Sequence, residues 1–457
     1  MSMRTDAAFL RVPLLLCAAA LCACSAVPGC QTATASSAEP RPETRVVENA
    51  EAVIAPGPPV LLDPEGPLNV LLILVDGLHD EMPWLGYERD IAPWMTQFEK
   101  RAVSYTRAYA ISSATARSVG PLLAGRYPSE MWRSGDYFTV YGQENVFVSE
   151  FAKAAGHHTL SAHSHAYFVE ETGISQGFSD FRRLPGTKLN NMDKENVTSE
   201  RMTELAMEML STKAATENDQ RFFAYFHFMD PHAPYLPHEP GPNWGDKPRD
   251  VYDQEVRFTD HWVGKLVDWA LSQPWGKHTA VIISADHGES FGAHNLYKHG
   301  YDLWEDVIHV PLLVYAPGAQ ARRIETPRSH IDLAPTILDL IGVDVPKELP
   351  GKTLVPELYG LAPEARPVIA DLPRDNLQDR RRALIRGTDK LMAFGDDRYF
   401  MLFDLKADPE ETRDLIRVEQ ERGADLIRLY QALSARIELR EVTGYAQLKG
   451  APEGRKW

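Results

Sequence analysis

Three runs of apolar residues constrain the fold of this chain more than any other feature of its sequence. Residues 68–75, 222–228 and 281–283 are dominated by Leu, Ile, Val and Phe. Apolar runs of this length are typical of strands buried on both faces, as in a sheet that helices cover on each side. With 457 residues, the chain is long enough for one large domain of this kind and a smaller one. We therefore predict an α/β fold with a doubly wound, mostly parallel sheet.

Acidic and histidine residues directly follow two of these strands. Asp76 precedes a glycine after the first, and Asp286 and His287 precede a glycine after the third. Open α/β sheets bind ligands at the carboxyl ends of their strands, so these side chains are expected to share one crevice. A carboxylate beside an imidazole, with His299 beyond a glycine-containing loop, suits a borderline divalent metal such as zinc. Each short motif alone is consistent with a polar turn, and their combination favours a metal site.

The composition excludes several classes of protein. There are 48 Lys and Arg against 64 Asp and Glu, giving a formal net charge of −16, which argues against a nucleic-acid partner. All four cysteines lie in the first thirty residues. The rest of the chain therefore has no disulfide, no thiolate metal site and no cysteine nucleophile.

The first 67 residues have the features of an export signal followed by a tether. Residues 1–23 carry two arginines and an apolar run too short for a stable membrane span, which indicates a signal peptide. The string L-C-A-C, ending at Cys24, resembles a bacterial lipoprotein cleavage box, in which that cysteine is lipidated. Cys30 is a second, weaker candidate for the lipidated cysteine. The alternative to both is an ordinary signal peptide that is cleaved without lipidation. Residues 24–67 are rich in Ala, Pro, Ser and Thr, as flexible linkers are. We predict an exported lipoprotein, membrane-anchored in the bacterial cell envelope on a side that the sequence leaves open.

Residues 109–128 place several hydroxyl side chains in front of an apolar segment that predicts a helix. A Ser or Thr at the start of a helix is commonly a capping residue. At the same place a nucleophile would benefit from the helix dipole and the free N–H groups, which stabilise an alkoxide and bind an oxyanion. The residues alone are compatible with both interpretations.

Five motifs in this order resemble the sulfatase family of the alkaline phosphatase superfamily. They are L-I-L-V-D-G, G-P-L-L-A-G-R-Y-P, H-F-M-D-P-H-A-P-Y, S-A-D-H-G-E-S-F-G and H-I-D-L-A-P-T-I-L-D-L-I-G-V. The similarity extends from residue 68 to about residue 415. It implies an alkaline phosphatase-like catalytic domain over residues 68–345 and a small C-terminal α+β subdomain over residues 346–440. Residues 441–457 are then a tail.

The resemblance also points to a nucleophile. In the family it lies ten residues before the glycine of the L-x-G-R-Y-P segment, which places it at Thr115. Sulfatases have C-x-P-S-R there, with the cysteine oxidised to formylglycine, whereas this chain has T-A-R-S-V, similar to phosphoethanolamine transferases. Ser113 is a serine-type alternative whose spacing is two residues wrong. A threonine ester cannot collapse to an aldehyde, so water must attack the central atom, which favours phosphate or phosphonate chemistry.

Further site residues follow from the resemblance. One or two divalent ions are expected, with zinc first and manganese or calcium as alternatives, held by Asp76, Thr115, Asp286, His287 and His299. Besides Thr115, the residues expected to be catalytic are His232, which matches the family's active-site histidine, and His299. Side chains expected to bind substrate are Arg117, His163, His165 and Lys298. Asp230 is either a turn acid or an extra ligand, and His227 is expected to pack within its strand.

We predict a metal-dependent hydrolase that cleaves a phosphate, phosphonate or sulfate ester through a covalent threonine intermediate. Its substrate would be a small-molecule, glycan or lipid ester, and its oligomeric state is not evident from the sequence. Three alternatives to this function remain. They are a sulfatase of serine or unmodified type, a phosphoethanolamine-type transferase, and an inactive metal-binding surface lipoprotein.

Overall fold

The computed structural model describes residues 66–185, 197–212, 221–238 and 241–440. The predicted signal peptide, the lipidation site Cys24, nearly all of the linker and the tail lie outside the described residues. Within the described ranges, every helix is too short or too polar to cross a bilayer.

The core of the fold is an eight-stranded sheet in the order β12-β2-β11-β7-β1-β6-β4-β5. At its centre β1 (Asn69–Val75) pairs in parallel with β6 (Phe222–Phe228) and β7 (Thr279–Ala285). Strands β4 (His158–His163) and β5 (Asp180–Arg183) continue the parallel part. On the other side β11 (Leu312–Tyr315) runs antiparallel to β7 and is followed by β2 (Val103–Tyr105) and β12 (Arg322–Ile324). The predicted mostly parallel sheet is confirmed.

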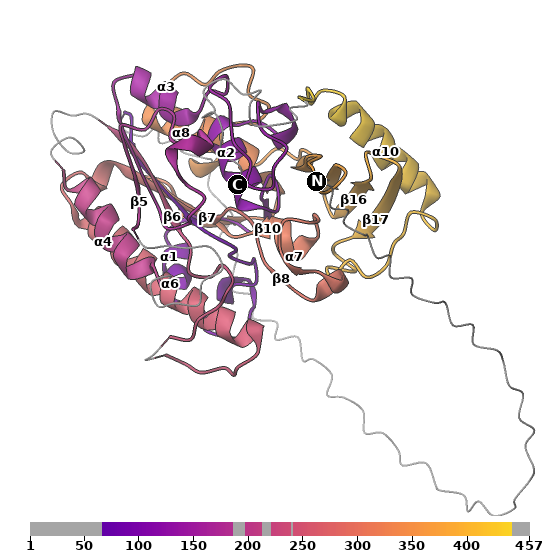
Figure 1. Ribbon diagram of the computed structural model, residues 1–457, viewed down its shortest axis with the longest axis horizontal. Coiled ribbons are helices and arrows are strands. Elements are labelled where there is room, and N and C mark those ends of the chain that lie inside the picture. The colour runs from indigo at the N-terminus through magenta and orange to yellow at the C-terminus, as the bar shows by residue number, and fades with distance from the viewer. Residues whose placement is uncertain (1–65, 186–196, 213–220, 239–240, 441–457) are drawn as a thin grey trace, which may run out of the picture. The chain divides into compact units, whose positions relative to one another are not determined.

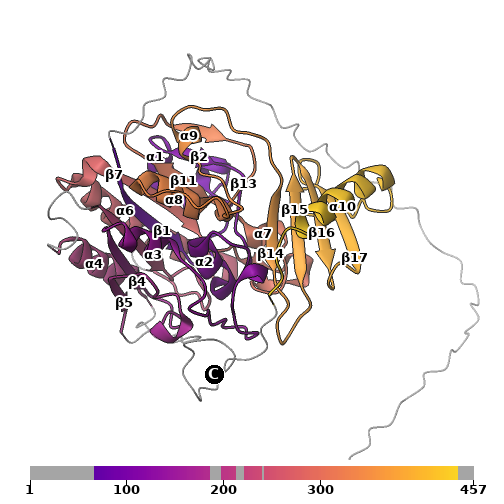
Figure 2. The ribbon, with the colours of Figure 1, turned by 90° about the horizontal axis from the view of Figure 1, so that it is seen from above.

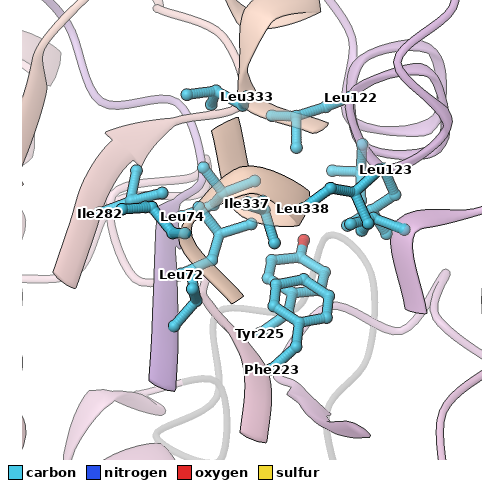
Figure 3. Packing of buried hydrophobic residues seen from close by; sticks show 14 of the residues in the cluster. Leu72, Leu74, Leu122, Leu123, Phe223, Tyr225, Ile282, Leu333, Ile337 and Leu338 are labelled. Atoms are coloured by element: carbon cyan, nitrogen blue, oxygen red, sulfur yellow. The ribbon is translucent and has the colours of Figure 1, made fainter. Parts of the chain in front are cut away.

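Helices cover both faces of this sheet (Figures 1 and 2). One face carries α2 (Thr115–Ala124), α3 (Val148–Ala154) and α8 (Leu333–Ile341), and the other carries α1 (Pro93–Glu99), α4 (Ser199–Leu210) and α6 (Pro248–Ser272). Side chains alternate between the two faces along a strand. Leu72 and Leu74 of β1 therefore lie in the hydrophobic core between the sheet and α2, α3 and α8, where Figure 3 shows them beside Ile337. Burying each such side chain stabilises the fold by about 1.5–3 kcal/mol.

Two segments beside this sheet change their geometry along the chain. A 3₁₀ turn, His330–Asp332, which the Ser329 side chain caps, leads directly into α8. Residues 309–315 form two short strands, β10 (His309–Val310) and β11. Pro311 lies between them and has no N–H to donate to a neighbouring strand, so the pairing changes there.

The C-terminal subdomain is a four-stranded antiparallel sheet. Its strands are β14 (Val368–Leu372), β15 (Arg381–Arg386), β16 (Asp389–Phe394) and β17 (Tyr399–Asp404), each paired with the next. One face packs on α10 (Gln420–Ser434), and the other packs on Trp304 and on Val307 of α7 (Glu305–Ile308). The predicted small C-terminal α+β subdomain is confirmed. The short elements are β3 (Ala108–Tyr109), β8 (Ser290–Phe291), β9 (Tyr297–Lys298), β13 (Arg328–Ser329) and α9 (Val355–Leu358).

A partly buried ion pair at the start of β10 makes stability depend on pH. Asp80 lies 2.9 Å from Nδ1 of His309, whose Nε2 is 3.0 Å from the Thr106 carbonyl oxygen. Burial alone would lower the pKa of His309, but the Asp80 and Glu305 carboxylates raise it to about 9. Because this pKa lies above the unfolded value near 6.5, the contribution is complete below about pH 6.5 and disappears as the pH rises through about 9.

We expect the free energy of unfolding to fall by about 3 kcal/mol between pH 6.5 and pH 9.5 through this pair. Urea denaturation at a series of pH values measures the decline, and His309→Gln should flatten it because glutamine does not titrate. A slope that is identical in the variant would contradict the assignment to His309.

Candidate active site

The sheet brings the predicted site residues to one edge. Val75, the last residue of β1, is paired with Phe228 of β6 and Ala285 of β7, so the residues that follow each strand leave the sheet side by side. Asp76 and Asp286 are completely buried there, and Thr115 at the start of α2 is 6% exposed. The prediction that these side chains share the carboxyl edge of the sheet is confirmed in its geometry.

The Thr115 hydroxyl faces the acidic cluster. Its Oγ1 lies 3.1 Å from Nε2 of His287 and 3.4 Å from Oδ2 of Asp76. His287 donates from Nδ1 to the Gly288 carbonyl oxygen at 2.8 Å, so Nε2 carries a lone pair that can accept the threonine proton or bind a cation. The N-cap of α2 is Ala114, and Thr115 is the first helical residue. Thr115 is therefore not a capping residue, and its hydroxyl is available for chemistry.

The two buried carboxylates have opposite electrostatic environments. Burial opposes ionisation of Asp76, but His232, His227 and His287 hold its pKa well below the usual value. Burial and the neighbouring Asp76 carboxylate raise the pKa of Asp286. Among the described residues Oδ2 of Asp286 has no hydrogen-bond partner. A buried, unpaired carboxylate oxygen beside a second carboxylate is costly unless a cation compensates it.

These residues fit a divalent metal. Ligand atoms of Asp76, Asp286 and His287 all lie within 4.8 Å of one another. Carboxylate oxygens with one imidazole nitrogen are a common donor set for zinc and manganese. The lone pair of His287 and the unpaired oxygen of Asp286 are the atoms that a cation would use.

A second group with the same spacing combines Asp76, His165 and His232. His232 donates from Nδ1 to the Ala233 carbonyl oxygen at 2.6 Å, which leaves a lone pair on its Nε2. His165 has the opposite arrangement, because its Nδ1 accepts the Tyr167 N–H at 2.9 Å. Burial lowers the pKa of His165 to about 3, so the ring is neutral and its one proton is on Nε2. His165 is thus equipped to donate a hydrogen bond to an anion.

Two contacts of the cluster were not predicted. His227 is buried within its strand and packs on Phe168, as expected, and its Nε2 also lies 3.1 Å from Oδ2 of Asp76 while Tyr225 Oη lies 2.8 Å from its Nδ1. Glu289, also fully buried, accepts from Nδ1 of His299 at 3.1 Å. Both contacts orient a site residue from behind. The D-H-G-E motif contains the signal for Glu289, which follows His287 by two residues.

His299 completes the cluster. Its ring centroid lies 4.1 Å from that of His287 and 5.0 Å from that of His232. With its Nδ1 proton directed at Glu289, its Nε2 is available to exchange a proton or bind a ligand. The predicted grouping of His232 and His299 with the metal residues therefore agrees with the geometry.

Other candidates are placed differently. His163 is completely buried, stacks on Phe168 at 4.4 Å and hydrogen-bonds Ser161, which corrects the prediction that it binds substrate. Asp230 accepts the N–H groups of Thr198 and Ser199 and so caps α4 instead of serving as an extra ligand.

The remaining two candidates differ in exposure. Lys298 is exposed on β9. Arg117 is completely buried, forms an ion pair with Asp375 of the C-terminal subdomain and lies over the Tyr137 ring.

Comparisons with known proteins find similar sequences for most of the chain. The family model described as Sulfatase matches residues 68–343, and the model for the C-terminal region of N-sulphoglucosamine sulphohydrolase matches residues 292–438. Among curated proteins, the uncharacterized sulfatase YidJ of Escherichia coli K12 is 31% identical over 168 residues, which is 35% of this chain and 32% of that protein. The chain spans about a third of the length of the first curated relatives that it matches.

Solved structures show the same fold. A 2-O GAG sulfatase superposes with a TM-score of 0.67 at 18% identity, covering 81% of this chain and 91% of that one. The phosphonate monoester hydrolase of Agrobacterium radiobacter superposes with a TM-score of 0.66 at 18% identity, covering 81% and 95% of the two chains. Both the sulfate and the phosphonate branches therefore share this architecture.

Proposed function

This chain belongs to the sulfatase family, and on that premise we propose that it is a hydrolase that cleaves a phosphate or phosphonate ester through a covalent intermediate on Thr115. The observation that carries the proposal is the position of the Thr115 hydroxyl, 3.1 Å from the lone pair of His287 and 3.4 Å from Asp76. A hydroxyl directed at a cation site is activated as a nucleophile when the cation is bound. Ser113, the alternative, has a buried hydroxyl without a hydrogen-bond partner among the described residues.

The metal would be held by Asp76, Asp286 and His287. When bound there, a divalent ion would lower the pKa of the Thr115 hydroxyl and offset the charge of the ester oxygens. Zinc and manganese suit this donor set better than calcium, since calcium prefers six to eight oxygen ligands.

The remaining chemistry would be carried out by the chain's own residues. In the first step the Thr115 hydroxyl loses its proton to solvent, its oxygen bonds to phosphorus, and the bond from phosphorus to the alcohol oxygen breaks. The Nε2–H of His165 and the free N–H groups of the first turn of α2 would bind the non-bridging oxygens. His299 would protonate the departing alcohol through Nε2 while its Nδ1–H stays with Glu289.

In the second step water gives a proton to Nε2 of His299 and its oxygen bonds to phosphorus. The bond to Thr115 then breaks, and the threonine takes up a proton from solvent. This step requires attack at phosphorus because a threonine ester offers no carbonyl through which the group can depart. That requirement is the physical reason for preferring phosphorus over sulfur. Sulfate ester hydrolysis is the second candidate, which the family and the 2-O GAG sulfatase fold favour.

A substrate comparison tests the proposal. The protein, depleted of metal and reloaded with zinc, manganese or calcium, is assayed with nitrophenyl phosphate, phenylphosphonate and sulfate esters. We expect metal-dependent turnover of the phosphorus esters, at least tenfold faster than of the sulfate ester. Turnover of the sulfate ester alone would replace the proposal with the second candidate, and turnover of none of the esters would remove both.

Removal of one ligand should abolish metal binding. Asp286→Asn keeps the size of the side chain but removes its negative charge, and loss of such a ligand typically weakens binding by at least about 100-fold. We expect the wild type to retain about one ion per chain after dialysis and the variant to retain almost none, as measured by elemental analysis. Metal should also raise the melting temperature of the wild type alone. Asp425→Asn, on the surface helix α10, is the matched control, and equal metal content in both variants would contradict the assigned site.

A further inference from the structure

One loop of the C-terminal subdomain contacts both halves of the proposed site. It follows β14 and includes the first residue of β15, and we call residues 373–381 the bridging loop. Its first half reaches α2, whose first residue is Thr115, and its second half reaches the segment that carries His299. The bridging loop therefore connects the nucleophile and the proton donor of the proposed reaction.

The contact with α2 is a buried ion pair. Arg117 lies two residues after Thr115, and its completely buried guanidinium pairs with Asp375, whose side chain is 1% exposed. The Nε and Nη1 atoms of Arg117 have no hydrogen-bond partner among the described residues, so Asp375 is the group that compensates this charge. Because an unpaired buried charge is costly, the first turn of α2 is held where the ion pair stays intact.

The bridging loop holds Asp375 in one orientation. Its Oδ1 accepts two backbone N–H groups of the same loop, at 2.6 and 2.7 Å, while Oδ2 pairs with Arg117. The next residue, Asn376, donates its backbone N–H to the Gly135 carbonyl oxygen of the catalytic domain at 3.0 Å. The carboxylate therefore has a fixed position on the catalytic domain, and the Arg117 side chain has to match it.

The second half of the bridging loop binds the chain directly after His299. Gln378 Nε2 donates to the Gly300 carbonyl oxygen at 3.2 Å, and the Arg381 guanidinium donates to the Tyr301 carbonyl oxygen. Gln378 Oε1 also accepts from Arg381 at 2.8 Å, so the two side chains support each other. The two carbonyl groups that they bind belong to the residues that follow His299, and their position limits where its ring can lie.

We propose that the bridging loop sets the distance between Thr115 and His299, and that Arg117, Asp375 and Gln378 are positioning residues of the reaction. The inference rests on the proposed function for the roles of the two groups that are positioned. A misplacement of about 1 Å can lower a rate about 100-fold, because bond formation requires reacting atoms that are close and aligned. This role of Arg117 differs from the substrate contact that the sequence predicts.

Kinetics with two leaving groups test the proposal. The metal-loaded full chain is assayed with the nitrophenyl and ethyl esters of the acid that it cleaves best, because nitrophenolate can leave without a proton whereas ethoxide needs one. Asp375→Asn displaces the nucleophile and should lower kcat about 10–100-fold for both esters, with little change in KM. Gln378→Ala displaces the acid and should lower kcat at least about tenfold for the ethyl ester and less than about twofold for the nitrophenyl ester.

The comparison of esters separates positioning from stability. A loss of folded protein lowers the rates for both esters by the same factor, so the ratio between them reports only on the site. Gln378 is half-buried and makes its contacts at the surface of the subdomain, so Gln378→Ala keeps the proposal testable even where Asp375→Asn fails to fold.

Hydrogen exchange measured by mass spectrometry tests the same contacts without turnover. We expect faster exchange in residues 112–120 of Asp375→Asn and in residues 296–303 of Gln378→Ala. Arg422→Met is the matched control, because it removes ion pairs of α10 within the same subdomain whose partners lie outside the bridging loop. It should leave exchange in both segments and the rates for both esters unchanged.

The outcomes distinguish this proposal from the proposed function. If the wild type cleaves no ester, the proposed function fails, and faster exchange in the two segments still supports the positioning role of the loop. Unchanged exchange in both variants, or rates equal to those of the wild type, overturns the proposal. A ratio between the esters that stays constant in Gln378→Ala, or equal effects in Arg422→Met, would overturn it as well, since the subdomain would then act only through general stability.

Discussion

Thr115→Ala is expected to reduce kcat for the best phosphorus ester by at least about 1,000-fold, because removal of a covalent nucleophile typically costs three to six orders of magnitude. Thr115→Ser keeps the oxygen and should retain about 1–10% of the activity. The loss should appear in kcat with little change in KM, since the hydroxyl bonds to the substrate only during the reaction. Steady-state kinetics with saturating metal measures both constants.

Ser113→Ala is the matched control, since this serine lies two residues before Thr115 and its hydroxyl has no partner among the described residues. Acid quenching during turnover, followed by peptide mass spectrometry, should find the phosphoryl group on Thr115. Full activity in Thr115→Ala, with loss of activity in Ser113→Ala, would transfer the nucleophile to the serine and revive the serine-type alternative.

The sequence is informative about this fold because its central strands carry their own signal. The runs that form β1, β6 and β7 are mostly apolar and completely buried, as a sheet covered on both faces requires, and β1 and β7 are followed directly by Asp76 and Asp286. Parallel pairing then brings Asp76 and Asp286 to the same edge. This grouping of carboxylates was predictable because it depends on strand order and on residues directly after strands.

Contacts made by side chains from within a strand were harder to predict. His227 lies inside an otherwise apolar strand, so packing was the natural interpretation, and only the structure shows its Nε2 beside Asp76. His163 and His165 illustrate the same limit. They are two residues apart, yet the first lies among aromatic rings while the second reaches the site. The register of β4 and the turn after it decide which histidine faces Asp76, and spacing alone does not reveal that register.

The C-terminal subdomain is joined to the catalytic domain by charge as well as by apolar packing. Arg117, two residues after the proposed nucleophile, pairs with Asp375 while both side chains are almost completely buried. Lys390 of β16, also fully buried, lies 3.0 Å from Glu305 of α7 and 2.8 Å from Glu411. The Arg117–Asp375 and Lys390–Glu305 pairs join segments more than eighty residues apart in the sequence. The Lys390–Glu411 pair joins β16 to the segment after β17. Loss of their charge balance should therefore destabilise the junction that positions the active site.

Lys390→Met is expected to lower the free energy of unfolding by about 3–5 kcal/mol, the usual cost of leaving a buried ion pair without one partner. Burial would lower the pKa of Lys390, but Glu305 and Glu411 raise it, so the ammonium is charged and offsets both carboxylates. Without it the two acids repel each other in a buried space. The loss should be smaller at pH 5 than at pH 8, because the uncompensated carboxyl groups can then bind protons.

Urea denaturation of Lys390→Met, with Lys406→Met as the exposed control, measures this cost. Addition of Glu305→Gln and Glu411→Gln to Lys390→Met should recover part of the lost stability, since no buried charge then remains unpaired. A loss below about 1 kcal/mol, equal at both pH values, would mean that water reaches the cluster and that the junction depends on apolar packing alone. Recovery in the triple variant would identify charge balance as the term that keeps β16 of the C-terminal subdomain against α7.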